Sequence, residues 1–165
     1  MDKLLFKTID LSEHADVAIR FREDSFRVSF GHADDFYEAD GLGAKRYLEW
    51  LSVRIAEYPD LHVHVWCEGE IIGQLEGRFD RGSPAVGYIN LYYLAPEWRG
   101  RGLASALDNY MCDVFTGRGC YAVRLSVSPT NARAIKFYTR HGWTDQGPRS
   151  DGSEVHLMEK DLMRP

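Results

Sequence analysis

The sequence predicts an α/β fold in a single domain that spans residues 1–165. Apolar residues switch repeatedly between helical spacing and strand-like runs, which predicts the element order β-α-α-β-β-β-α-β-α-β-β. A length of 165 residues is typical of one compact domain, and no repeat, low-complexity segment or linker interrupts the pattern.

Composition limits the classes of function. A net charge of −5 argues against nonspecific binding of nucleic acid, and it weakly favours a cationic amine substrate. No apolar stretch is long enough to cross a bilayer, and the charged first residues favour an initial strand over a signal peptide. Cys67, Cys112 and Cys120 form no metal-like pair, so we expect reduced thiols, no metal and a cytoplasmic protein.

The N-terminal part begins with a strand over Leu4–Ile9. Ser12 is a plausible N-cap for a helix that runs to about Phe26. A second helix is expected from Ala44 to Tyr58, where Pro59 ends it. The loop between the two helices carries the acidic residues Asp34, Asp35, Glu38 and Asp40.

The middle of the chain reads as a series of hairpins. Residues 61–68 alternate as a strand does, and a turn at Glu68-Gly69-Glu70 leads into the strand 71–79. His62 and His64 share one face of the first strand, as a pH-sensitive pair or a metal pair would. Because no third ligand is evident, packing or surface histidines are the better interpretation.

The C-terminal part begins with the strand Gly87–Leu94, rich in aromatic and β-branched residues. After it we expect a helix from Leu103 that stops before Gly117, a strand over 121–127, and a helix that ends at Gly142. Two final strands are expected over residues 143–146 and 154–160.

A glycine-punctuated loop, Arg99-Gly100-Arg101-Gly102-Leu103-Ala104, joins the central strand to the following helix. Backbone N–H groups at a helix start lack intrahelical partners, and glycines let an anion approach them closely. Two arginines add cationic forks suited to phosphate. The loop lacks the ending of a P-loop, and Ser105 replaces the third glycine of a dinucleotide fingerprint. An ordinary strand–helix loop is the alternative.

Two motifs resemble one known family. Arg99-x-x-Gly102-x-Ala104 is similar to the Arg/Gln-x-x-Gly-x-Gly/Ala signature of the GNAT superfamily of N-acetyltransferases. Residues 131–143 resemble that family's Asn-x-x-Ala-x-x-Phe-Tyr-x-x-x-Gly-Phe segment, with Trp143 in place of Phe. The resemblance covers most of residues 70–160.

The resemblance implies a GNAT-like α/β (α+β) domain with a mixed, mostly antiparallel sheet of six to seven strands and about four helices. It also implies acetyl-CoA as the acetyl donor, with its pyrophosphate on the loop backbone and its pantetheine arm along the end of the central strand. The implied cofactor-binding residues are Tyr92, Tyr93, Leu94, Arg99, Gly100, Arg101, Gly102, Leu103, Ala104, Ser105 and Asn131.

Two residues are catalytic candidates. Tyr138 aligns with the family's tyrosine, and a phenol remains protonated at neutral pH, so it can protonate the leaving thiolate. The alternative role of Tyr138 is that of a core tyrosine, and the alternative role of Asn131 is that of a helix cap. Tyr88 and Asn90 stand where many members carry a glutamate base. Glu76 is therefore the candidate base, acting through water, and its alternative is an exposed strand glutamate.

These observations predict an N-acetyltransferase that moves acetyl from acetyl-CoA to a primary amine by direct attack in a ternary complex. The alternative is a non-catalytic module that binds or senses acyl-CoA. The expected partner is a small-molecule or peptide amine, without nucleic acid or membrane, and the protein is expected to be a monomer or a homodimer. Glu23 and Asp24 are weaker candidates for holding a cationic acceptor.

Overall fold

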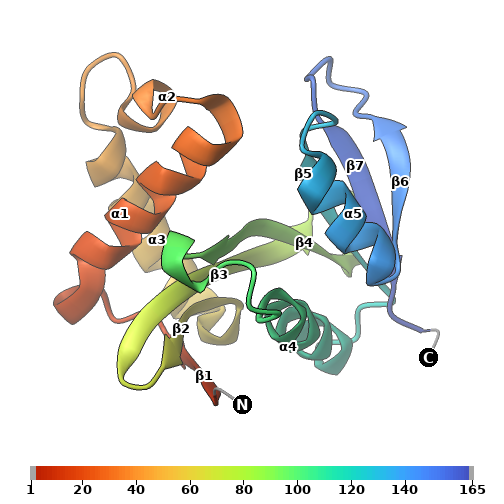
Figure 1. Ribbon diagram of the computed structural model, residues 1–165, viewed down its shortest axis with the longest axis horizontal. Helices are drawn as coiled ribbons and strands as arrows, with labels where there is room; N and C mark the ends of the chain where they lie inside the picture. Colours follow the sequence, from red (N-terminus) through yellow and green to blue (C-terminus); the bar gives the residue numbers. More distant parts are fainter. Residues whose placement is uncertain (1–2, 164–165) are drawn as a thin grey trace. The chain divides into compact units, whose positions relative to one another are not determined.

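The computed structural model describes residues 3–163. Its strands are β1 (Leu4–Thr8), β2 (His62–Cys67), β3 (Glu70–Asp80), β4 (Ser83–Leu94), β5 (Ala122–Val127), β6 (Trp143–Pro148) and β7 (His156–Asp161) (Figure 1). Its helices are α1 (Leu11–Phe30), α2 (Asp34–Tyr37), α3 (Gly43–Glu57), α4 (Ala104–Gly117) and α5 (Ala132–Arg140), with short 3₁₀ helices η1 (Pro59–Leu61) and η2 (Pro96–Trp98).

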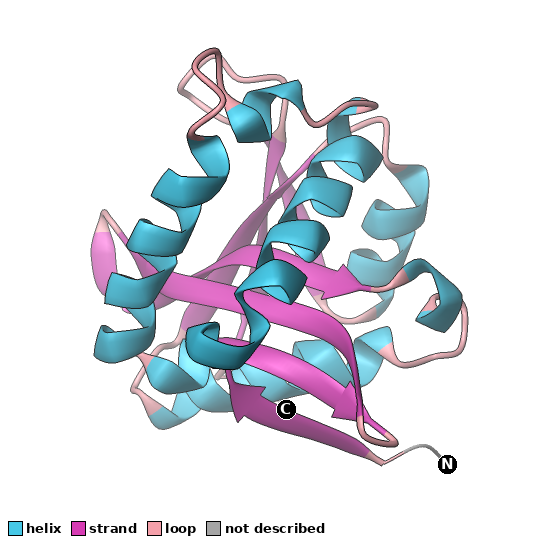
Figure 2. Ribbon diagram, turned by 90° about the vertical axis from the view of Figure 1, so that its left-hand side faces the viewer, coloured by secondary structure: helices cyan, strands magenta, loops and turns pink. Residues whose placement is uncertain are grey.

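The seven strands of the described chain form one sheet in the order β1-β2-β3-β4-β5-β7-β6. The β4–β5 pair is parallel, whereas β1–β2, β2–β3, β5–β7 and β6–β7 are antiparallel. Figure 2 shows these strands in magenta and the helices in cyan. The predicted α/β class with a mixed, mostly antiparallel sheet is confirmed. Within the described residues, the one α-helix beyond the four that were expected is α2, a single turn within the acidic loop.

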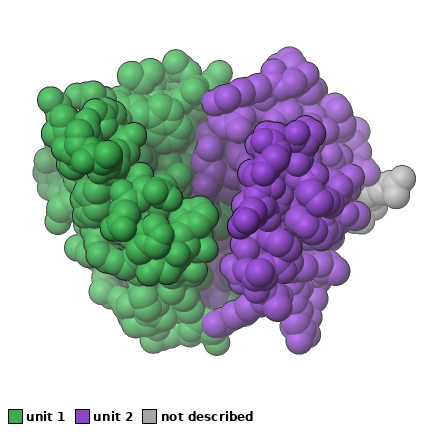
Figure 3. All heavy atoms as spheres, turned by 90° about the horizontal axis from the view of Figure 1, so that it is seen from above, with its two compact units in different colours: residues 1–76, 92–102 green, residues 77–91, 103–165 purple. Residues whose placement is uncertain are grey.

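The chain divides into two compact units (Figure 3). Unit 1 contains residues 1–76 and 92–102, and unit 2 contains residues 77–91 and 103–165. Strands β3 and β4 each begin in one unit and end in the other. Nothing in this division tests the expected single domain over residues 1–165, which stays a prediction. Within residues 3–163, no helix has both the length and the apolar character needed to cross a bilayer.

Unit 1 is built around α1 and α3. Ile9, Ala18 and Leu51 form a buried cluster between these helices and the start of the chain. The N-cap of α1 is Asp10, not the expected Ser12, because the Asp10 carboxylate accepts a hydrogen bond from the Ser12 N–H at 3.0 Å. The helix also continues to Phe30, where Gly31 ends it in the left-handed region.

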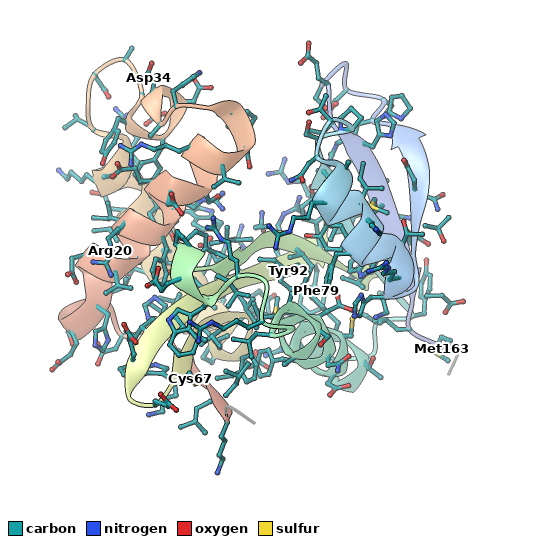
Figure 4. All side chains as sticks on the ribbon, in the orientation of Figure 1. Arg20, Asp34, Cys67, Phe79, Tyr92 and Met163 are labelled. Atoms are coloured by element: carbon teal, nitrogen blue, oxygen red, sulfur yellow. The ribbon has the colours of Figure 1, made fainter. Side chains whose placement is uncertain are left out.

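Unit 2 is built around α4. Phe115 of this helix fills the space over two strand glycines, because a Cβ on Gly87 would lie 2.5 Å from its ring and one on Gly77 3.1 Å from it. Phe79, labelled in Figure 4, meets the same ring edge to face. These two glycines therefore let α4 approach β3 and β4 closely, and they define the face of the strands that α4 covers.

Candidate active site

The glycine loop follows β4 and η2 and leads into α4. Gly100 and Gly102 adopt φ angles of 75° and 79°, in the left-handed region that favours glycine, and α4 begins at Ala104. A Cβ placed on Gly102 would meet no heavy atom within 4 Å. The glycine is therefore needed for its conformation, and the space above its backbone is open to a ligand.

The side chain of Arg99 makes bonds that the sequence did not suggest. Its Nε donates to the Leu94 carbonyl at 2.8 Å, and its Nη2 lies 3.1 Å from a carboxylate oxygen of Asp24. The same Asp24 oxygen accepts from the Tyr93 hydroxyl at 2.6 Å. Arg99 thus ties the end of β4 to α1. The Arg101 guanidinium lies 4.6 Å from the centre of the Trp98 ring. A role for either arginine toward phosphate stays a prediction.

The end of β4 offers backbone groups along one edge. The Ala95 N–H donates to the Ile72 carbonyl of β3 at 2.7 Å, and a Cβ on Gly73 would lie 2.4 Å from the Tyr93 carbonyl oxygen. Backbone groups alternate in direction along a strand. The N–H of Leu94 therefore points away from β3.

Within unit 2, strands β4 and β5 part before they end. Their parallel register runs from the pair Val86–Ala122 to the pair Ile89–Leu125. Strand β4 continues beyond this pair, while β5 continues to Val127 in register with β7.

Tyr138 lies on α5 next to a buried polar cluster. Its ring meets Trp143 edge to face at 5.6 Å, and Trp143 donates its indole N–H to Asp108 at 3.1 Å. Lys160 donates to the other oxygen of Asp108 at 2.8 Å. Burial, and then the negative charge of Asp108, raise the pKa of Tyr138 above its usual value. The hydroxyl therefore stays protonated throughout the physiological range of pH.

Asn131 is the N-cap of α5, because its side-chain oxygen accepts from the Ala134 N–H at 3.2 Å. The alternative role considered for this residue is therefore present. A bond from Asn131 to the cofactor stays a prediction.

Glu76 is not the exposed strand residue considered above, because it is fully buried in unit 1. Its Oε2 accepts from the Tyr47 hydroxyl at 2.7 Å and from the Gln74 amide at 2.8 Å. Its Oε1 has no hydrogen-bond partner in the described part of the chain. Burial, followed by the charge of Glu76, raises the pKa of Tyr47 well above its usual value.

The two strand histidines pack in the interior, as the preferred interpretation had it. His62 and His64 are 0% and 1% exposed, and His64 shares a 2.8 Å hydrogen bond with Gln74. Burial lowers the pKa of both rings, that of His64 to about 4. Among residues 3–163, no group of three or more His, Cys, Asp or Glu side chains is arranged to hold a metal ion.

Most of the acidic residues that favoured a cationic acceptor have basic partners. Arg46 binds both Glu38 and Asp40, and Glu23 pairs with Arg27. Asp24 is engaged by Tyr93 and Arg99, as described above. Asp34, labelled in Figure 4, lies at the start of α2 with His32 3.7 Å away. These pairings weaken the argument for electrostatic capture of a cation.

The sequence did not single out a cluster around Tyr88. The Tyr88 hydroxyl lies 2.6 Å from the Ser126 hydroxyl, and Arg149 donates to both, at 3.0 and 2.7 Å. The guanidinium of Arg78 lies 4.1 Å from the centre of the Tyr88 ring. Strand alternation indicates that Arg78 and Tyr88 lie on the sheet face away from α4, but no sequence signal places Arg149 beside them.

These features define a class of protein: an α/β fold in which the central strand parts from its neighbour and a glycine loop leads into the next helix. Residues 21–143 match the model of the acetyltransferase (GNAT) family, and the chain belongs to that family.

Two relatives and two solved structures illustrate the likeness. Glucosamine 6-phosphate N-acetyltransferase of Trypanosoma brucei brucei is 34% identical over 86 residues, which cover 48% of this chain and 56% of that protein. Acetyltransferase SG1711 of Sodalis glossinidius is 32% identical over 82 residues, covering 50% and 56%. The chain thus spans about half the length of these curated relatives.

The solved structures resemble the whole fold. PaiA N-acetyltransferase from Thermoplasma acidophilum, in complex with coenzyme A, has a TM-score of 0.77 at 16% identity and covers 96% of this chain and 99% of that one. Ard1 from Thermoplasma volcanium has a TM-score of 0.74 at 18% identity, covering 98% and 99%. At these identities the likeness concerns the fold, and it agrees with the predicted GNAT-like architecture.

Proposed function

We propose that this protein transfers the acetyl group of acetyl-CoA to a primary amine. The observation that carries the proposal is a single family match over residues 21–143, which includes both the glycine loop and the motif on α5. The name of the Trypanosoma relative specifies an amino sugar as the acceptor of that protein, which supports an amine as the acceptor class here.

Acetyl-CoA, the acetyl donor, would be held by backbone N–H groups. The residues Gly100 to Ser105 lead into α4, where the N–H groups of the first turn and the helix dipole favour a pyrophosphate. The Leu94 N–H, which points away from β3, is suited to the pantetheine arm or to the thioester oxygen. One aimed donor of this kind is worth ~10²–10³ in rate.

The transfer would proceed by direct attack. The amine nitrogen forms a bond to the thioester carbonyl, the carbon–sulfur bond breaks, and the sulfur takes a proton from Tyr138. The proton lost by the amine passes through water to Glu76, whose Oε1 has spare acceptor capacity. An acetyl-cysteine intermediate is disfavoured, because all three thiols are buried and burial raises the pKa of Cys112 to about 12.

A turnover assay tests this function. Purified protein is mixed with acetyl-CoA and a panel of polyamines, amino acids, amino sugars and N-terminal peptides, and released coenzyme A is measured as free thiol. We expect acetylated product, identified by mass, for at least one class of amine.

Calorimetry with acetyl-CoA separates the ways in which this test can fail. Binding without turnover of any amine would contradict the enzyme and favour a module that binds or senses acyl-CoA. Absence of binding would contradict the role of the glycine loop.

A further inference from the structure

The strands of unit 2 have one face that α4 does not cover. Gly77 and Gly87 face α4, so their neighbours Arg78 and Tyr88 point to the opposite face. Gly87 pairs with Val123 and Val123 with Lys160, whose side chain reaches Asp108 on α4. The α4 face therefore extends across β5 and β7. Tyr88 pairs with Arg124 of β5, so these two residues lie on the face away from α4. Ser126 is two residues beyond Arg124 on the same strand, and it therefore lies on that face too.

Two arginines converge on Tyr88 at this face. Arg149, from the turn after β6, donates to the hydroxyls of Tyr88 and Ser126 and lies 5.8 Å from the centre of the Tyr88 ring. Arg78 lies over the same ring at 4.1 Å. Arg149 is 31% exposed and Arg78 is half-buried, so both guanidinium groups keep surface that a ligand can reach.

The two arginines differ in how their charge is compensated. Arg149 pairs with the exposed Asp151, whose carboxylate oxygen lies 3.3 Å from its Nε, whereas Arg78 has no such partner within residues 3–163. Neighbouring Arg124 is held by two carboxylates, Asp80 at 3.0 Å and Glu159 at 2.8 Å. Arg78 has no carboxylate within 4.0 Å among the described residues, and its Nη1 donates only to the Phe79 carbonyl. Burial chiefly, with a contribution from the positive charges of Arg81 and Arg149, lowers the pKa of Arg78.

We propose that Arg78 and Arg149, with the hydroxyls of Tyr88 and Ser126, bind an anionic group, a carboxylate or a phosphate, carried by the acceptor amine. Guanidinium forks match such oxygens in geometry and charge. Tyr88 and Ser126 directly adjoin the pair Ile89–Leu125, after which β4 and β5 part. An anion bound there places the rest of the acceptor at the parting of the strands. This assignment to the acceptor rests on the proposed function.

Matched acceptors test the proposal. We compare kcat/KM for amines that differ only in the anion: glucosamine 6-phosphate against glucosamine, and amino acids against their amides. The wild-type protein should prefer one anionic member by at least about tenfold, since hydrogen bonds to charged groups contribute about that much or more. The two pairs also distinguish phosphate from carboxylate.

Variants assign the preference to the cluster. In Arg78→Gln and Arg149→Gln the ratio of anionic to neutral kcat/KM should fall at least about tenfold, mainly through KM of the acceptor. Arg81→Gln is the matched control: it removes the same charge from an exposed neighbour and should keep the wild-type ratio. Inorganic phosphate should inhibit competitively against the acceptor, and more weakly in Arg78→Gln.

The possible failures are distinct. Equal turnover of both members of every pair, or an unchanged ratio in both arginine variants, overturns the anion site and leaves the acetyltransferase intact. Turnover of no amine at all, with acetyl-CoA bound, overturns the proposed function and the acceptor site with it.

Discussion

The chemistry open to Tyr138 is determined by what surrounds its ring. Asp108 is fully buried and accepts from Trp143 and Lys160, so a negative charge is maintained close to the phenol. Burial and this charge raise the pKa of Tyr138, which excludes a base role at neutral pH and leaves the hydroxyl protonated. A proton donor is what a departing thiolate requires.

Replacement of Tyr138 by Phe removes this donor and keeps the ring. We expect kcat to fall at least about tenfold, because general acid catalysis is worth ~10²–10⁴ and water replaces part of it. The KM for acetyl-CoA should change less than kcat. Tyr121→Phe, at an exposed tyrosine of the same unit, is the control. A wild-type kcat in Tyr138→Phe, measured where chemistry limits the rate, would identify a structural tyrosine.

The burial of Glu76 changes the interpretation of this residue, which the sequence left open as an exposed strand glutamate. A carboxylate that holds Tyr47 and Gln74 serves the packing of unit 1, while its unpartnered Oε1 is suited to receive a proton. Glu76→Gln keeps the shape and removes the base. We expect kcat/KM for the amine to fall at least about tenfold.

Glu70→Gln, on an exposed residue of the same strand, is the control for Glu76→Gln. If Glu76→Gln keeps the rate and only lowers the melting temperature, Glu76 is a packing residue and the base lies elsewhere.

At the level of elements, β4 and its loop connect the binding features. Arg99 donates hydrogen bonds to the Leu94 carbonyl and to Asp24, so the end of β4 is fixed to α1. The Leu94 N–H points away from β3. Figure 4 labels Tyr92 on the same stretch. A backbone fixed in this way loses less entropy when a ligand binds along it.

The loop itself is tested by Gly102→Glu. The carboxylate would repel the pyrophosphate and occupy the open space above the loop, so the affinity for coenzyme A should fall at least about tenfold in calorimetry. Gly119→Glu is a close control, because Gly119 has φ of 88° and a Cβ placed on it, as on Gly102, would meet nothing within 4 Å. Equal loss in both variants would mean that backbone strain, not phosphate binding, explains the effect.

For the whole molecule, the buried histidines link stability to pH. Burial lowers the pKa of His64 to about 4, so the folded protein resists a proton that the unfolded chain takes up near pH 6.5. The stabilisation is complete above pH 6.5 and is lost as the pH falls toward 4. At about 1.4 kcal/mol per pKa unit, His64 contributes at most about 3 kcal/mol to this dependence.

Urea denaturation at several pH values measures this linkage. In His64→Gln the free energy of unfolding should depend less steeply on pH between 6.5 and 4 than in the wild type. His32→Gln, whose ring is 52% exposed, is the control and should keep the wild-type slope. An unchanged slope in His64→Gln would mean that the ring takes up its proton equally in the folded and the unfolded state, and would contradict the lowered pKa.

Features that depend on near neighbours were predictable from the sequence. The order of the elements, the glycine loop, the cap at Asn131 and the burial of an apolar core all follow from residues a few positions apart. Backbone dihedral preferences and hydrophobic periodicity act over these short distances. For this reason the family and its fold were also predictable.

The partners of the charged side chains were decided by the tertiary structure alone. Arg99 meets Asp24 across 75 residues and Arg149 meets Tyr88 across 61, and the burial of Glu76 depends on Tyr47, 29 residues away. Strand alternation gives the face on which a side chain lies, but not which distant turn or helix covers that face. Charge and burial at the candidate site depend on those distant neighbours, so they follow from the fold and not from any local pattern.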